Sequence, residues 1–90
     1  MKKIDIYSSD ACPYCRQAKQ LLDRESIPYN EIKIQIVGGR KVEDANFKEM
    51  KQRALGQTTV PQIIIDNEYY GDDDTLVEDI RKNRFRERIA

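Results

Sequence analysis

The chain has 90 residues, of which 16 are basic and 16 are acidic, so its formal net charge at pH 7 is zero. This balance argues against nucleic acid as the main partner, because phosphate binding requires a net basic surface. No apolar run approaches the roughly 18 residues of a membrane span, and Lys2 and Lys3 precede a mixed strand instead of a secretory signal. We therefore expect one small domain over residues 1–90, cytoplasmic and with no membrane partner.

The first half of the chain predicts a strand, a helix and a second strand, over residues 2–7, 13–25 and 29–37. Both strands alternate apolar and polar side chains, which is typical of half-buried strands. The helix repeats small and apolar side chains every three or four positions, and these are Cys15, Ala18, Leu21 and Leu22. Gly38-Gly39 then breaks the second strand. We interpret residues 35–46 as a long solvent-exposed loop.

The second half predicts a helix, two strands and a final helix, over residues 43–55, 62–65, 68–70 and from 73 onwards. Gly56 suits the C-terminal cap of the first of these helices. The third strand is apolar on consecutive positions, so it is expected to be central, and Asp66-Asn67 turns it into a hairpin. The final helix carries a charged tail, residues 81–88, which we interpret as a solvated face that frays. The order βαβαββα predicts an α/β fold with a four-stranded mixed sheet flanked by three helices.

Cys12-Pro13-Tyr14-Cys15 is the most informative motif, and it holds the only two cysteines of the chain. It stands where a helix follows a strand, so the unpaired N–H groups and the dipole of the first helical turn favour a thiolate at Cys12. Pro13 suits the first helical position, where a missing N–H costs nothing. Cys15, one turn further on, is expected to reach a disulfide formed on Cys12. The motif therefore predicts a redox-active pair.

Two other readings of the cysteines remain open, a structural disulfide and half of a zinc site. A zinc site needs two more ligands, and the chain contains no histidine, so only a dimer could supply further thiolates. We expect no metal. The missing histidine also excludes a histidine-assisted nucleophile.

Three motifs together resemble the dithiol glutaredoxins of the thioredoxin-fold superfamily, over nearly the whole chain. They are Cys12-Pro13-Tyr14-Cys15, then Thr59-Val60-Pro61, then Gly71 followed by Asp73-Asp74 and Leu76. The resemblance implies that Pro61 is cis and lies against the cysteines.

The resemblance also implies a glutathione site. In it, the Val60 backbone would hold the cysteinyl part of glutathione by strand-like hydrogen bonds, beside Thr59 and Pro61. Asp73 and Asp74 would meet the γ-glutamyl group, and Tyr14 would border the groove. Asp72 to Asp74 would also cap the final helix.

The chain departs from the family pattern at two positions. Ser9 stands where many members carry a lysine, and Asp72 stands where many carry a second glycine. The cation that would meet a glutathione carboxylate must then come from elsewhere, and the candidates are Arg16, Lys19, Lys48 and Arg53. Lys48 is the best placed of them by alignment.

The resemblance implies a monomeric, glutathione-dependent thiol–disulfide oxidoreductase that reduces protein disulfides and glutathione mixed disulfides. Glutathione would be its co-substrate, with the Cys12 thiolate as nucleophile and Cys15 as resolving thiol. One alternative is a hydrogen donor to ribonucleotide reductase that is recharged by thioredoxin reductase. Another is a dimer that binds a [2Fe–2S] cluster through Cys12 and glutathione, although Pro13 argues against it because cluster-binding relatives more often carry a smaller residue there.

Overall fold

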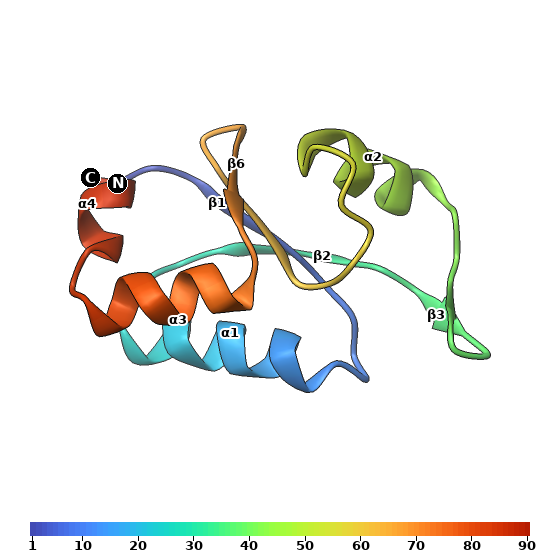
Figure 1. Cartoon of the computed structure of the whole chain (residues 1–90), viewed down its shortest axis with the longest axis horizontal. Helices are drawn as coiled ribbons and strands as arrows, with labels where there is room; N and C mark the ends of the chain where they lie inside the picture. The colour runs from blue at the N-terminus through green and yellow to red at the C-terminus, as the bar shows by residue number, and fades with distance from the viewer.

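Four strands form a mixed sheet in the order β2-β1-β5-β6 in the computed structural model, which describes all residues 1–90 (Figure 1). Their bounds are β1 (Ile4–Ser8), β2 (Asn30–Lys33), β5 (Gln62–Ile65) and β6 (Glu68–Gly71). Strand β2 runs parallel to β1, whereas β5 pairs antiparallel with both β1 and β6. The predicted central position of residues 62–65 is confirmed, and all four residues of β5 are buried.

Three helices cover one face of the sheet, which is the lower face in Figure 1. They are α1 (Pro13–Arg24), α3 (Asp73–Arg81) and α4 (Phe85–Ile89). Helices α1 and α3 pack side by side with their N-terminal ends at the same end of the molecule. The core between these helices and the sheet contains ten buried apolar residues, among them Ile6, Leu22 and Leu76. None of the helices is long and apolar enough to cross a membrane.

A single helix, α2 (Ala45–Arg53), lies over the opposite face of the sheet (Figure 1). Its N-cap is Asp44, whose carboxylate accepts the Phe47 N–H at 3.0 Å. Phe47 and Met50 bury themselves against Tyr7, Ile34 and Ile64, which together form a smaller core of five residues. The helix is shorter at both ends than the predicted range of residues 43–55.

The interpretation of residues 81–88 as a solvated, fraying tail is right about the charged side chains, which are exposed, and wrong about the fraying. Helix α4 is a fourth helix, one more than the sequence analysis expects, and Phe85 and Ile89 are each 2% exposed. The Phe85 ring meets Tyr70 edge to face, with the ring centroids 5.4 Å apart. The Lys2 N–H donates to the Ile89 carbonyl at 2.7 Å, which ties the two chain ends together. Phe85 and Ile89, four positions apart, therefore anchor this mostly charged segment to the core.

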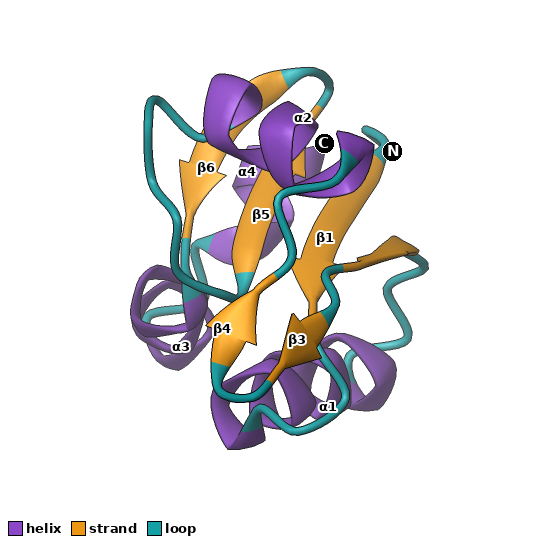
Figure 2. Cartoon of the chain, turned by 90° about the vertical axis from the view of Figure 1, so that its right-hand side faces the viewer, coloured by secondary structure: helices purple, strands orange, loops and turns teal.

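The single strand predicted over residues 29–37 is also wrong in its second part, and so is the loop at 35–46. The sheet strand ends at Lys33, and β3 (Ile36–Val37) instead forms a hairpin with β4 (Arg40–Lys41). Gly38 and Gly39 turn this hairpin, both with positive φ, as a two-residue turn requires. Figure 2 shows the hairpin beside the start of α1.

The β5–β6 pair contains a register shift, and the two tyrosines of β6 lie on opposite faces of the sheet. Ile63 is opposite Gly71, but Ile64 is opposite Tyr69, so β6 contains one extra residue at this point. Tyr69 therefore shares the α2 face with Ile64, while Tyr70 packs against the larger core. Gly71 has φ +153°, and a Cβ there would lie 2.5 Å from the Thr75 hydroxyl oxygen, so glycine is required.

Candidate active site

Cys12 is the N-cap of α1, and its sulfur lies at the end of the helix where backbone N–H groups are unpaired. The Sγ atom accepts the Cys15 N–H at 3.1 Å. Pro13 occupies the first helical position, as the sequence predicts. The side chain is partly exposed. An anionic sulfur is stabilised in this position both by the hydrogen bond and by the helix dipole.

Cys15 faces the interior and is fully buried, with 0% of its surface exposed. Burial, followed by the hydrogen-bonded interaction with Cys12, raises the pKa of the Cys15 thiol well above its ordinary value, although the Ser9 backbone and Lys19 oppose the shift. Both cysteines are free thiols, so this is the reduced form of the pair. The two sulfurs therefore differ in accessibility. Cys12 can contact a substrate directly, whereas Cys15 is buried.

The Thr59-Val60-Pro61 segment faces Cys12 from across the fold. The Val60–Pro61 peptide bond is cis, as the resemblance implies. The Cys12 thiol lies 3.7 Å from the Val60 carbonyl oxygen, although 48 positions separate these residues in the sequence. The Val60 N–H has no hydrogen-bond partner within the protein. Val60 thus carries an unpaired backbone N–H, and its carbonyl oxygen lies near the Cys12 sulfur.

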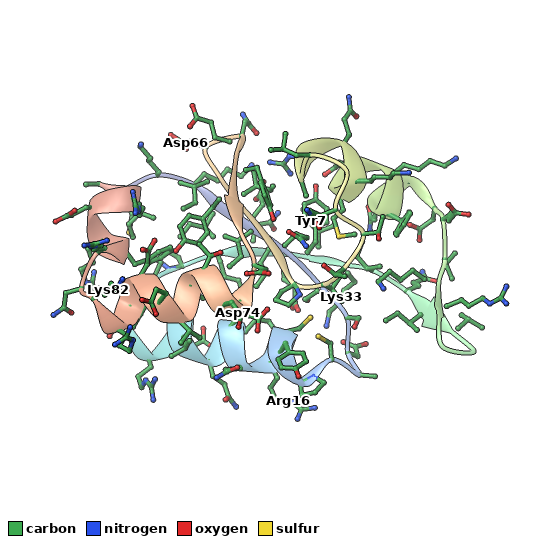
Figure 3. All side chains as sticks on the ribbon, in the orientation of Figure 1. Tyr7, Arg16, Lys33, Asp66, Asp74 and Lys82 are labelled. Atoms are coloured by element: carbon green, nitrogen blue, oxygen red, sulfur yellow. The ribbon has the colours of Figure 1, made fainter.

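The first turn of α3 carries three consecutive aspartates. Asp72 is the N-cap, and its carboxylate accepts the Thr75 N–H and the Thr75 hydroxyl, each at 3.2 Å. Burial raises the pKa of Asp73, the backbone N–H groups of residues 73 and 74 oppose this, and repulsion from the neighbouring aspartates adds to it. Asp74 is exposed. Figure 3 shows it at the start of α3, the end of the helix that lies alongside the start of α1.

Tyr14 is the remaining predicted side chain, and it is 61% exposed on the first turn of α1. Thr59 is exposed as well. The chain therefore brings Cys12, Cys15 and Val60 together by direct contact, and places Tyr14 and Asp74 on the first turns of the two packed helices.

Of the four cations that could meet a carboxylate of a ligand, two are engaged elsewhere. Arg53 pairs with Asp5 at 2.8 Å, and Lys19 pairs with Glu31 at 2.6 Å. Arg16 and Lys48 are exposed and form no ion pair. Ser9, at the position of the usual lysine, is 3% exposed, and its hydroxyl has no hydrogen-bond partner.

Glu31 forms an ion-pair cluster next to α1 that the sequence analysis does not predict. Its carboxylate accepts hydrogen bonds from Ser8 and from Lys19, and Lys33 lies 3.4 Å away. Burial opposes ionisation, but these partners outweigh it and lower the pKa of Glu31 to about 2. Glu31 stands at an ordinary polar position of an alternating strand, so no local signal reveals its partners.

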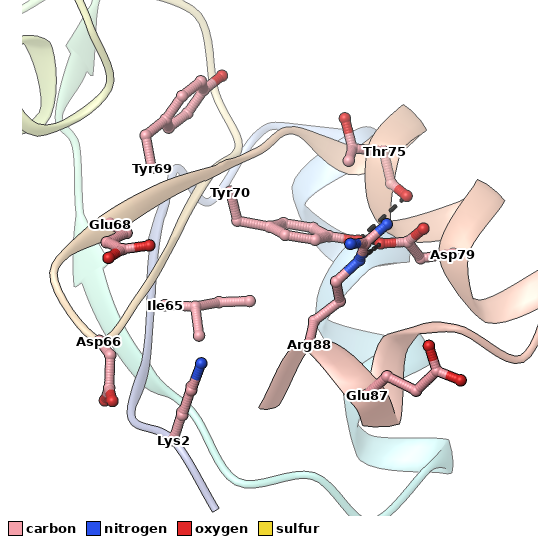
Figure 4. Close-up of a pocket in the computed structure, with 10 residues that line it drawn as sticks. All are labelled: Lys2, Ile65, Asp66, Glu68, Tyr69, Tyr70, Thr75, Asp79, Glu87 and Arg88. Carbon is pink, nitrogen blue, oxygen red and sulfur yellow. Dashed lines mark hydrogen bonds and ion pairs between the residues drawn. The ribbon is translucent and has the colours of Figure 1, made fainter. Parts of the chain in front are cut away.

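A groove of about 750 Å³ lies elsewhere, between β6 and the helices α3 and α4 (Figure 4). Its central group is the Asp79 carboxylate, which accepts the Tyr70 hydroxyl at 2.6 Å and the Arg88 Nε at 3.2 Å. No predicted functional residue lines this groove. The side chains of Tyr70, Asp79 and Arg88 are paired with one another, so they fasten α4 to α3 and β6.

A reduced cysteine pair at a helix N-terminus, opposite a cis-proline segment, defines a thiol–disulfide oxidoreductase of the thioredoxin-fold class. Comparison with known proteins specifies the family. Residues 4–70 match the family model described as Glutaredoxin. Glutaredoxin 3 of Escherichia coli strain K12 is 37% identical over 76 residues, which cover 84% of this chain and 83% of that protein.

Solved structures agree with this assignment. The solution structure of a glutaredoxin from Brucella melitensis matches with a TM-score of 0.74 and 31% identity, covering 97% of this chain and 87% of that one. The crystal structure of a buckwheat glutaredoxin–glutathione complex matches with a TM-score of 0.76 and 26% identity, covering 96% and 74%. The chain belongs to the glutaredoxin family of thiol–disulfide oxidoreductases.

Proposed function

We propose that this protein is a glutathione-dependent oxidoreductase in which Cys12 is the nucleophile and Cys15 is the resolving thiol. The observation that supports this most is the difference between the two sulfurs. Cys12 is partly exposed at the helix N-terminus, whereas Cys15 is buried and its pKa is raised. Only the first sulfur is reachable by a substrate.

In the first step, the Cys12 thiolate attacks the glutathione sulfur of a protein–glutathione mixed disulfide. A bond forms between Cys12 and that sulfur, the original S–S bond breaks, and the protein sulfur leaves as a thiolate that takes a proton from water. The hydrogen bond from the Cys15 N–H stabilises the attacking anion. This hydrogen bond stabilises the thiolate more than the adduct, because the Cys12 sulfur is neutral in the adduct. A stronger hydrogen bond would therefore make the thiolate a poorer nucleophile.

In the second step, the thiolate of a second glutathione attacks the glutathione sulfur held on Cys12. This releases oxidised glutathione and restores the Cys12 thiolate. Alternatively, Cys15 loses its proton and attacks the Cys12 sulfur, which releases glutathione and leaves a disulfide between the two cysteines. Because the pKa of Cys15 is raised, the first route is expected to dominate for mixed disulfides. Reduction of a protein disulfide requires both thiols.

We assign glutathione to the surface formed by Cys12, Val60 and the start of α3. The free Val60 N–H and the Val60 carbonyl would pair with the cysteinyl residue in the manner of an added strand. Asp73 and Asp74 would meet the γ-glutamyl group, while Tyr14, Thr59 and Pro61 would border the ligand. Lys48 and Arg16 are the two free cations for its carboxylates. The glutathione complex of the buckwheat relative supports this assignment.

We further propose that the protein acts as a monomer in the cytoplasm, where glutathione keeps the pair reduced. In that setting the partners are glutathione and proteins that carry a disulfide or a glutathione adduct. No metal is required for either step of the reaction.

A coupled assay with glutathione, glutathione reductase and NADPH on a small glutathione mixed disulfide tests the proposal. The wild type should turn over, Cys12→Ser should lose activity entirely, and Cys15→Ser should keep much of it. Equal loss in the two variants would contradict the assignment of roles. No turnover by the wild type with glutathione, together with reduction by thioredoxin reductase, would favour the alternative donor function.

A further inference from the structure

Gln62, the first residue of β5, is almost completely buried, and every polar atom of its amide is bonded. Its Nε2 donates to the Thr59 carbonyl and to the Thr59 hydroxyl, both at 3.0 Å. Its Oε1 accepts the Tyr69 hydroxyl at 2.7 Å. A carbonyl can only accept, so the contact with Thr59 fixes which end of the amide faces the loop. Gln62 therefore joins β6 to the loop that precedes β5.

The loop end of this connection is the residue next to Val60. Thr59 is exposed and belongs to no strand or helix, so few other contacts hold it in place. At the other end, Tyr69 packs against the core under α2, on a strand paired with β5. The three residues form a relay from Tyr69 through Gln62 to Thr59.

We propose that Tyr69 and Gln62 are positioning residues for glutathione binding, because they hold the Val60 backbone at the distance and angle that the ligand requires. This inference rests on the proposed function of the Val60 segment. Neither side chain touches the sulfurs or the ligand. They act through Thr59, whose carbonyl begins the peptide unit that carries the free Val60 N–H.

Strand alternation places the two tyrosines of β6 on opposite faces of the sheet. Tyr69 is opposite Ile64, on the face that Gln62 shares, whereas Tyr70 packs on the other face. Figure 4 shows the two tyrosine side chains leaving β6 in different directions. The Tyr70 hydroxyl bonds Asp79 at 2.6 Å instead. The chain therefore offers two adjacent tyrosines whose hydroxyls each form a partly buried hydrogen bond, and only the bond of Tyr69 leads to the site.

Tyr69→Phe keeps the ring in the core and removes only the hydroxyl that bonds Gln62. We expect the KM for a small glutathione mixed disulfide to rise roughly threefold to tenfold, the loss typical of one buried hydrogen bond. The kcat should stay within about twofold, because a backbone contact made equally in the ground and transition states affects KM alone. The rate of alkylation of Cys12 in the reduced protein should be unchanged.

Tyr70→Phe is the matched control, since it removes a hydroxyl of the same kind from the next residue. It should lower thermal stability to a similar degree and leave the KM unchanged. Gln62→Met is a second test variant. It removes the hydrogen bonds to Thr59 and to Tyr69 and keeps a side chain of similar length. If the residues act in series, the double variant Tyr69→Phe with Gln62→Met should have the same KM as Gln62→Met alone.

A readout without turnover comes from the amide NMR signals of Thr59 and Val60. They should shift or broaden in Tyr69→Phe and remain in place in Tyr70→Phe. An active wild type whose KM and Val60 amide signal are both unaffected by Tyr69→Phe would overturn the relay. So would a Tyr70→Phe variant with the same rise in KM. Absence of turnover in the wild type is a different result, which would refute the proposed function itself.

Discussion

The two faces of the sheet are held in different ways. The face under α1, α3 and α4 is closed by a core of ten buried apolar residues, and a single buried carboxylate, Asp79, ties α3 to α4 and β6 beside it. The face under α2 has five, and one of them is Tyr7, which projects toward α2 (Figure 3). Burial and the hydrogen bond to Glu49 raise the pKa of this tyrosine to about 12. Beside it, Arg53 binds the Tyr7 hydroxyl and the Asp5 carboxylate, both at 2.8 Å.

The two sides of the active site are therefore supported by different interactions. The cysteines stand on α1, which rests on the larger core, so the nucleophile is attached to the part of the molecule that buries the most apolar surface. Val60 packs against the smaller core under α2, and polar bonds hold its loop in place. Since hydrogen-bonded networks depend on every member, we expect the ligand-binding side to be more sensitive to single polar changes than the sulfur side.

Phe85→Ala should have the largest effect of the stability variants. It removes a ring that is 2% exposed and in contact with Tyr70, and such truncations cost about 3 to 5 kcal/mol. Urea unfolding followed by circular dichroism measures the loss. Arg84→Ala, an exposed neighbour, is the control and should cost less than about 0.5 kcal/mol. Equal, small effects would mean that α4 does not contribute to the core.

Arg53→Met should cost somewhat less, about 2 to 3 kcal/mol, because it leaves the Asp5 carboxylate buried without its ion partner. Replacing Asp5 by Asn in the same protein should recover part of this loss, since the unpaired charge is then gone. Lys51→Met, on the same helix but without an ion pair, is the matched control. A double variant less stable than Arg53→Met would show that the α2 face does not depend on this pair.

Glu31→Gln should have the smallest effect, about 1.5 kcal/mol at pH 7, which is the lower end of the range for hydrogen bonds to a charged group, because this side chain is 26% exposed. The pKa of Glu31 is lowered to about 2 in the folded protein and is near 4.3 in an unfolded chain. Its contribution is therefore fully present above about pH 5 and is lost as the pH falls toward 2.

The check on Glu31 is a comparison of unfolding free energies between pH 7 and pH 3. The difference between the wild type and Glu31→Gln should narrow as the pH falls. Glu68→Gln, at an exposed residue without an ion pair, serves as control and should show no such trend. A difference that stays constant with pH would mean that the Glu31 carboxylate is not selectively stabilised by folding.

Local signals predict most of the fold and the centre of the site. Periodicity identifies the strands and the first two helices, turn chemistry identifies Asp66-Asn67, and the cysteine spacing identifies the helix N-terminus. These features depend on residues a few positions apart. The cis bond before Pro61 is implied only by the resemblance to a family, because a single proline in a sequence does not reveal its isomer.

The features that sequence reasoning misses depend on partners far away in the chain. Helix α4 is held in place by the contact between the Phe85 and Tyr70 rings. The Glu31 carboxylate is held by its ion pair with Lys19. The relay from Tyr69 to Thr59 depends on the contacts that Gln62 makes with both residues, and no local pattern marks these contacts. The hairpin of β3 and β4 was missed because strands of two residues carry too little alternation to be recognised.

The proposed mechanism depends most on the difference in reactivity between the Cys12 and Cys15 sulfurs. Trapping the glutathione adduct tests this difference directly. Reduced Cys15→Ser and reduced Cys12→Ser should each be mixed with oxidised glutathione at pH 7 and followed by mass spectrometry of the intact protein. We expect rapid addition of one glutathione, on Cys12, in the Cys15→Ser variant, and almost none in the other. Addition to Cys15 at a comparable rate would contradict the account, because the buried thiol would then be as reactive as the exposed one.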